Sequence, residues 1–174
     1  MEIAQQFFTQ TPIWVWIILV WLVSRGIRSR RPGTTTLLKM AIIPLLFTGW
    51  GIFDLATIYG VKPETVGTWL VGIAAGAVVG WYIASRSSIV ADRAAGVLHR
   101  PADYWLLPLL LVTFAVKYVF GVIGAVSPDL LTETGFRLFD LILSGFFTGI
   151  FVGKFIRYAS IWRAAGVPAT QAGS

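Results

Sequence analysis

Five apolar stretches alternate with short polar connections along the chain. They run over residues 7–23, 40–59, 66–85, 104–126 and 136–155. A helix needs about 20 predominantly apolar residues, within a range of roughly 17–25, to cross the hydrocarbon core of a bilayer. The pattern therefore predicts an all-α fold, a polytopic membrane bundle of five transmembrane helices forming one domain over residues 1–163. Residues 164–174 are small and polar, and we expect them to form a flexible cytoplasmic tail.

The connections alternate in charge as well. Eleven of the 14 Lys and Arg residues fall on one side of the predicted helices, two (Lys62 and Arg137) fall on the other, and Lys117 lies within a helix. Connections rich in Lys and Arg stay in the cytoplasm, so we expect the N-terminus outside and the C-terminus inside. The first stretch has no basic residue before it and no small-residue cleavage site after it, which predicts a retained helix rather than a signal peptide.

The connection between the third and fourth stretches has a pattern of its own. Residues 89–92 and 97–100 are partly apolar and flank the short segment 93–96. The arrangement resembles a β-hairpin. A one-turn helix over residues 91–97 is the alternative.

Composition narrows the class of protein. The chain is 56% hydrophobic and 13% charged, whereas soluble domains carry about 25% charge. The absence of cysteine excludes disulfides, thiolate metal sites and thiol redox chemistry within this chain, and the single histidine, His99, argues against haem or zinc. We expect no metal and no cofactor. The net charge of +6 is spread over short connections beside apolar stretches, a pattern typical of a lipid-facing surface and not of nucleic-acid binding.

Apart from the residues at their very ends, the apolar stretches contain three charged residues. Asp54 lies late in a helix that runs outward, Lys117 lies past the middle of another, and Asp140 lies near the start of a helix that runs inward. The predicted topology therefore places all three in the outer leaflet, with Lys117 as the central cation. A charge in hydrocarbon costs at least ~2.5–3.5 kcal/mol, so partners are expected. Further candidate partners are Trp50, Tyr59, Tyr118 and Arg137.

Two interpretations of this charged set remain open. It is either a hydrated site that opens outward and binds an ion or small solute, or an ion-pair network that fixes the register of the helices. The first predicts a protein of transport or sensing. The second predicts a non-catalytic assembly or accessory factor of a membrane complex. An enzyme is the least expected class, because the sequence has no Walker loop, dinucleotide fingerprint, zinc-protease motif or nucleophile elbow.

Two rows of glycine recur at four-residue spacing in the third and fifth stretches. Such rows let helix backbones approach closely in lipid. They predict close packing within the bundle, and the alternatives are a homo-oligomer interface or a sliding surface. The rows are Gly72, Gly76 and Gly80, and Gly145, Gly149 and Gly153.

The connection 87–103 also carries a polar group of residues. Arg93, His99 and Arg100, together with Arg86, are candidates for binding lipid headgroups or an anionic partner. The alternative is a topogenic loop whose positive charge holds it inside. Asp92 is placed to pair with Arg93 or Arg100.

Part of the chain resembles a known kind of protein. The residues that carry the resemblance are Asp92, Arg93, Gly96, Pro101, Phe114, Lys117 and Tyr118. This run resembles uncharacterised small multi-pass membrane proteins of bacteria, including the CcdC-like kind. Those proteins often have a glycine after the proline, where this chain has Ala102. The resemblance implies a location in the bacterial inner membrane. The expected partners are the lipid bilayer and either further copies of this chain or another membrane protein. It implies no catalytic residues, and the absence of cysteine rules out carrying over a thiol-transfer role.

Overall fold

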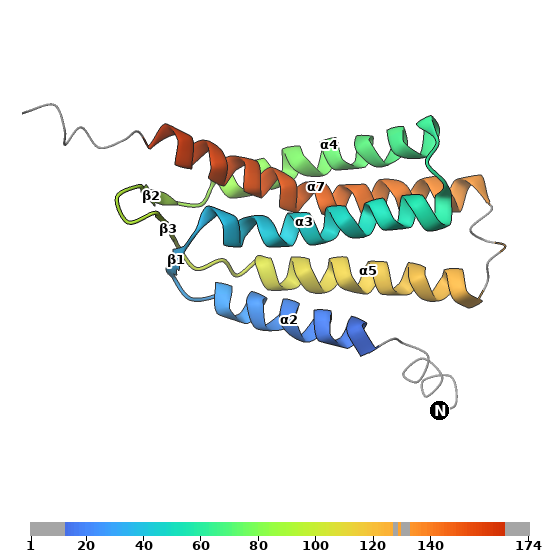
Figure 1. Cartoon of the computed structure of the whole chain (residues 1–174), viewed down its shortest axis with the longest axis horizontal. Coiled ribbons are helices and arrows are strands. Elements are labelled where there is room, and N and C mark those ends of the chain that lie inside the picture. Colours follow the sequence, from blue (N-terminus) through green and yellow to red (C-terminus); the bar gives the residue numbers. More distant parts are fainter. Residues whose placement is uncertain (1–12, 127–128, 130–132, 166–174) are drawn as a thin grey trace, which may run out of the picture.

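The computed structural model describes residues 13–126, 129 and 133–165. The helices are α2 (Ile13–Ser29), α3 (Leu37–Asp54) with its π-helical continuation η1 (Leu55–Tyr59), α4 (Pro63–Ser85), α5 (Leu106–Val126) and α7 (Thr134–Ala164). The strands are β1 (Gly33–Thr35), β2 (Val90–Asp92) and β3 (Val97–Arg100). The helices run along the long axis of the molecule, and the strands gather at one end (Figure 1). We call that end the inner end and the opposite end the outer end, after the predicted orientation.

Four helical segments are long and apolar enough to cross a membrane: Leu37–Tyr59, Pro63–Ser85, Leu106–Ile123 and Thr134–Ala164. Helix α2 has 17 described residues. Residues 7–12, the rest of the first predicted stretch, lie outside the described part of the chain. The fold is therefore that of a membrane protein with four candidate spans, and the fifth span and the orientation stay predictions.

The predicted bounds of the first and last helices were wrong at their inner ends. Helix α2 continues past residue 23 to Ser29, and α7 continues past residue 155 to Ala164. An apolar stretch shows only the part of a helix that can lie in the hydrocarbon of the bilayer. Both helices continue beyond that part through arginine-containing segments, and arginine favours helix formation. The predicted tail therefore begins on the last helical residue, and residues 166–174 lie outside the described residues.

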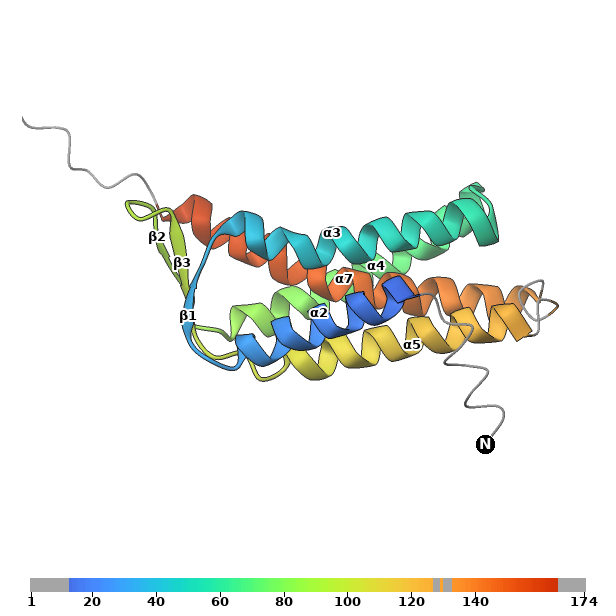
Figure 2. The same cartoon turned by 60° about the horizontal axis from the view of Figure 1, so that its bottom comes forward.

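The three strands form a small antiparallel sheet across the inner end, in the order β1-β3-β2 (Figure 2). The hairpin interpretation of residues 89–100 was correct and the one-turn helix was wrong. Gly96 turns the chain with φ +69°, a left-handed value that glycine adopts at no steric cost. Asp92 Oδ1 accepts a hydrogen bond from the backbone N–H of Ala95 in the same turn. Strand β1, which the sequence pattern did not predict, pairs with β3.

The core divides into two apolar clusters. The larger joins α2, α3, α5 and α7, with the Phe47 and Phe151 rings stacked 5.0 Å apart. The smaller lies toward the outer end, where Leu55, Tyr59, Trp69 and Leu141 pack together. Hence α7 contributes to both clusters, and α3 with its continuation η1 does so too.

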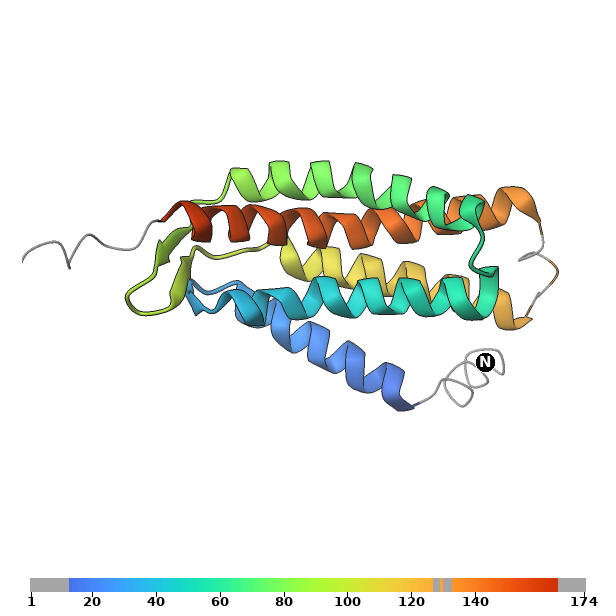
Figure 3. The ribbon, with the colours of Figure 1, turned by 45° about the horizontal axis from the view of Figure 1, so that its top comes forward.

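Helices α4 and α7 lie side by side over most of their length (Figure 3). A Cβ added to Gly76 would lie 1.9 Å from the carbonyl oxygen of Phe146, and one added to Gly149 would lie 2.2 Å from that of Ile73. The other four glycines of the two rows meet the opposite backbone in the same way: Gly72, Gly80, Gly145 and Gly153. The two rows therefore face each other within one chain, and neither is left open on the surface.

Candidate functional site

The charged residues of the apolar stretches gather at the outer end. Lys117 on α5 and Asp54 on α3 form an ion pair, with 2.5 Å between Nζ and Oδ2. Only 6% of the Lys117 side chain and 14% of the Asp54 side chain are exposed. Each charge thus has the partner that its removal from water requires.

Asp140 on α7 has a different partner. The phenol of Tyr59, the last residue of η1, donates a hydrogen bond to the Asp140 carboxylate, and both residues are buried. Lys117 attracts the Asp140 carboxylate, and Asp54 repels it. Among the described residues, Lys117 therefore forms an ion pair with Asp54 and not with Asp140. We call Asp54, Tyr59, Lys117 and Asp140 the outer cluster.

The other predicted partners of the charged residues are Arg137, Tyr118 and Trp50. Among the described residues, no ion pair joins Arg137 to Asp140, and the Nε of Arg137 is buried without a hydrogen-bond partner. The Tyr118 ring stacks on Phe114, with centroids 6.2 Å apart. Trp50 is half-buried on α3.

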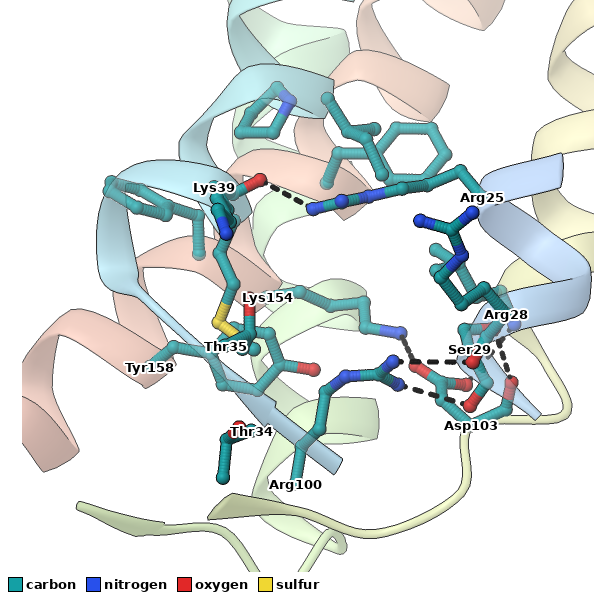
Figure 4. A pocket seen from close by; sticks show the side chains of 16 residues that line it. Arg25, Arg28, Ser29, Thr34, Thr35, Lys39, Arg100, Asp103, Lys154 and Tyr158 are labelled. Carbon is teal, nitrogen blue, oxygen red and sulfur yellow. Dashed lines mark hydrogen bonds and ion pairs between the residues drawn. The ribbon is translucent and has the colours of Figure 1, made fainter. Parts of the chain in front are cut away.

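A second polar region, at the inner end, surrounds an open cavity of about 270 Å³. We call it the inner cavity. It lies between the inner ends of α2, α3 and α7 and is bounded by β1 and by the link from β3 to α5 (Figure 4). Its charged lining residues are Arg25, Arg28, Lys39, Arg100, Lys154 and Asp103. Five cations therefore face a single carboxylate among the described lining residues.

That carboxylate belongs to a second buried ion pair. Lys154 Nζ lies 2.6 Å from Asp103 Oδ2, and only 7% of the Lys154 side chain is exposed. The other oxygen, Oδ1, accepts hydrogen bonds from the backbone N–H groups of Trp105 and Leu106 and so caps the start of α5. Ser29 holds the Asp103 backbone through two hydrogen bonds. Asp103 is therefore held from two sides and presents Oδ2 to the cavity.

Two of the three arginines in the described lining of the cavity are held by helix ends. Arg100 donates hydrogen bonds to the carbonyl oxygens of Ser29 and Arg28, the last residues of α2, and Arg25 donates to that of Lys39. Figure 4 shows Arg100 and Lys154 directed toward Ser29 and Asp103. The Arg25 guanidinium is repelled by Arg100 and Arg28. Within the described part of the chain, the side chains of Arg28 and Lys39 make no hydrogen bond or ion pair.

Most of the polar residues in and beside the hairpin make contacts that stabilise the fold. Arg93 donates to the carbonyl oxygens of Trp162 and Arg163 and stacks over the Trp162 ring, which caps the end of α7. Asp92 lies 3.9 Å from the exposed His99 and pairs with neither arginine, contrary to expectation. Arg86 contacts Tyr82 on α4. Of the predicted group, Arg100 alone reaches the described lining of the cavity.

Sequence reasoning missed most of the inner cavity. Arg25, Arg28 and Lys39 were used only to predict which ends of the helices face the cytoplasm. Lys154 lies inside the fifth predicted stretch, 136–155, so the argument that singled out Lys117 could have found it. Asp103 carried no such signal, because it sits in a connection and reaches Lys154 only through the fold.

The fold and these two regions define a small helical membrane protein with a buried Lys–Asp pair near each end of its bundle. The chain belongs to a family of unknown function, DUF6622, which matches residues 2–168. No curated protein matches the chain, and no solved structure matches it. The resemblance to the CcdC-like proteins stays a prediction.

Proposed function

We propose that this protein binds a small anion at the inner cavity, and that this binding serves transport or sensing at the bacterial inner membrane. The observation that carries the proposal is the charge around the cavity: five cations and one carboxylate line a space of about 270 Å³. That volume is close to the lower end of the ~300–1,000 Å³ typical of small-molecule sites.

Electrostatics favour an anion in this space. Two unit charges 4 Å apart interact by ~4 kcal/mol at an effective dielectric constant of about 20, so clustered cations destabilise one another. Arg25 is repelled by two of its neighbours in this way. An anion among these groups replaces repulsion with charge-assisted hydrogen bonds, and arginine offers them in pairs.

The outer cluster is a weaker candidate for the solute site. Asp54 is paired with Lys117, and Asp140 is hydrogen-bonded by Tyr59, so these groups largely satisfy one another. The inner cavity, in contrast, has two cations that make no described hydrogen bond or ion pair. We therefore propose the inner cavity as the binding site and the outer cluster as the network that links α3, α5 and α7.

Calorimetric titration tests the proposal. The purified protein, in nanodiscs of neutral phosphatidylcholine, is titrated with inorganic phosphate and with pyrophosphate. We expect saturable binding that weakens as salt is added. The double variant Arg28→Gln/Lys39→Gln should weaken it by at least tenfold. Neither side chain makes a described contact that holds the fold, so the variant should fold normally.

Arg31→Gln is the matched control. Arg31 is exposed, and it is not among the described residues that line the cavity. The control variant should bind phosphate as the unaltered protein does. Equal losses in both variants, or no saturable binding at all, would overturn the proposal.

The second candidate function is an accessory factor of a membrane complex. The paired outer cluster favours it, because paired charges hold helices together without a solute. The glycine rows cannot serve as the docking face in this case, since they face each other. Native mass spectrometry of protein extracted from its own membranes should then show a stable heteromer. A monomer or homomer would reject this function.

A further inference from the structure

Asp103 is the one acidic residue in the described lining of the inner cavity, and hydrogen bonds fix both of its carboxylate oxygens. Oδ1 accepts from the backbone N–H groups of Trp105 and Leu106, at 3.2 and 3.1 Å. Oδ2 accepts from Lys154 Nζ, at 2.6 Å. An ionised carboxylate has about four acceptor sites. Described donors therefore fill three of them, and the fourth, on Oδ2, is left for a ligand in the cavity.

Lys154 places a hydrogen-bond donor next to this acceptor. Its ammonium group has three N–H bonds, of which one points to Asp103 (Figure 4). The other charged residues of the described lining are all cations: Arg25, Arg28, Lys39 and Arg100. The lining is therefore matched by an anion whose oxygens mostly accept hydrogen bonds, but which also carries one hydroxyl group that donates a hydrogen bond to Asp103.

We infer that the anion of the inner cavity is hydrogen phosphate, HPO₄²⁻, whose P–OH group donates a hydrogen bond to Asp103 Oδ2 while its other oxygens accept from the cations. This inference rests on the proposed function and names the ligand for the same site. Asp103 is then the residue that selects the ligand. Sulfate has the same shape and the same charge but no proton, so one of its oxygens would face Oδ2 with no hydrogen between them. A site that hydrogen-bonds a hydroxyl group strongly rejects an analogue that lacks it.

The same reasoning separates hydrogen phosphate from phosphate monoesters. A monoester loses its last proton with a pKa of about 6, so at about pH 8 it is a dianion without a P–OH group. Inorganic phosphate is also a dianion under these conditions, but it keeps one proton. Binding measured in mildly alkaline buffer therefore compares anions of equal charge that differ in the proton offered to Asp103.

Calorimetric titration at about pH 8 tests the inference in neutral nanodiscs with four probes: phosphate, arsenate, sulfate and methyl phosphate. Arsenate keeps one proton in this buffer, as phosphate does. We expect phosphate and arsenate to bind with similar affinity, and each at least about tenfold more tightly than sulfate and methyl phosphate. Arg28→Gln/Lys39→Gln should weaken phosphate and sulfate by similar factors, because it removes positive charge and leaves the carboxylate in place.

Asp103→Asn tests the selecting residue. The asparagine oxygen can still accept from the N–H groups at the start of α5, while its amide presents a donor where Oδ2 was an acceptor. The preference for phosphate over sulfate should therefore fall at least about tenfold. A purely structural defect would weaken both anions alike and leave this preference unchanged. Asp92→Asn is the matched control, because Asp92 lies outside the described lining, and it should keep the preference.

The outcomes separate the inference from the proposed function. If sulfate or methyl phosphate binds as tightly as phosphate, the inference is overturned and the proposed function stands. A folded Asp103→Asn variant that keeps the preference for phosphate also overturns the inference. If this variant does not fold, the four probes on the unaltered protein still decide. If none of the four anions binds saturably, both the inference and the proposed function fail.

Discussion

Lys117 Nζ lies 2.5 Å from Asp54 Oδ2, and this ion pair joins α5 to α3 in the outer part of the bundle. Lys117→Met should lower the free energy of unfolding by about 3–5 kcal/mol, because it leaves the Asp54 carboxylate buried without its partner. Lys117→Met/Asp54→Asn should recover most of that loss, since replacing both charges removes the unpaired one. Unfolding of the detergent-solubilised variants in increasing dodecyl sulfate measures both.

Lys62→Met is the control for this pair, because Lys62 is an exposed lysine at the same end of the bundle. It should change the unfolding free energy by less than about 0.5 kcal/mol. A double variant as unstable as Lys117→Met alone would show that the charges do more than satisfy each other.

The hydrogen bond from Tyr59 to Asp140 supports the second carboxylate of the outer cluster. Tyr59→Phe removes the donor and should destabilise the protein by about 1–3 kcal/mol, the cost of leaving a buried acceptor unsatisfied. Combining it with Asp140→Asn should give a loss smaller than the sum of the two single losses, as a double-mutant cycle detects. Tyr104→Phe, at an exposed tyrosine, should have no effect. Additive losses would contradict a direct contact.

The backbone contact between α4 and α7 predicts a contrast within one helix. A Cβ at position 76 would lie 1.9 Å from the Phe146 carbonyl oxygen, whereas one at position 67 meets nothing within 4 Å. Gly76→Ala should therefore force the helices apart and destabilise the bundle by about 1–3 kcal/mol. Gly67→Ala should be neutral or slightly stabilising. The same denaturant titration compares them, and equal effects would contradict the observed facing of the rows.

Arg93 caps α7 by donating to the carbonyl oxygens of Trp162 and Arg163. Arg93→Ala should speed hydrogen exchange in the last turn of α7 about fivefold, which corresponds to losing ~1 kcal/mol of local stability. The central turns of α7 should exchange as before. Arg163→Ala, at an exposed side chain, is the comparison and should leave the last turn unchanged. No difference between the two variants would show that the cap is dispensable.

The predicted orientation can be tested directly because the chain has no cysteine. Single cysteines at Glu64→Cys, in the first turn of α4, and at Ala94→Cys, in the hairpin, report the outer and inner ends. A thiol reagent that does not cross membranes should label Glu64→Cys in intact cells and label Ala94→Cys only after the cells are opened. The reverse pattern would invert the topology and place the inner cavity outside.

Periodicity and length sufficed to predict the helices, because each helix must satisfy its own backbone in lipid and shows this as a long apolar run. The same reasoning failed at the inner ends of α2 and α7, which project beyond the apolar run. It also missed β1, because three residues of strand carry no pattern until β3 provides a partner.

The candidate site was predictable only in part. Lys117 and Asp54 stood out because charges are rare inside apolar stretches, and the fold does bring them together. The inner cavity depends on contacts between distant segments, such as Lys154 with Asp103, 51 positions apart. In a single sequence, all of the cavity's charged residues except Lys154 look like ordinary loop or interfacial charges. They form a region of concentrated positive charge only because the fold brings them close together.

The contacts of Arg100 also set an order of events during synthesis of the chain. The carbonyl oxygen of Ser29 accepts hydrogen bonds from the Arg100 side chain and from the Asp103 backbone, 71 and 74 positions later, and that of Arg28 accepts from Arg100 and from Arg31. While the ribosome is still making α3 and α4, the Ser29 carbonyl oxygen therefore lacks both of these donors and can bond only to water or to the insertion machinery. The hairpin, made after α4 and before α5, therefore fixes the end of the first helix only late in synthesis.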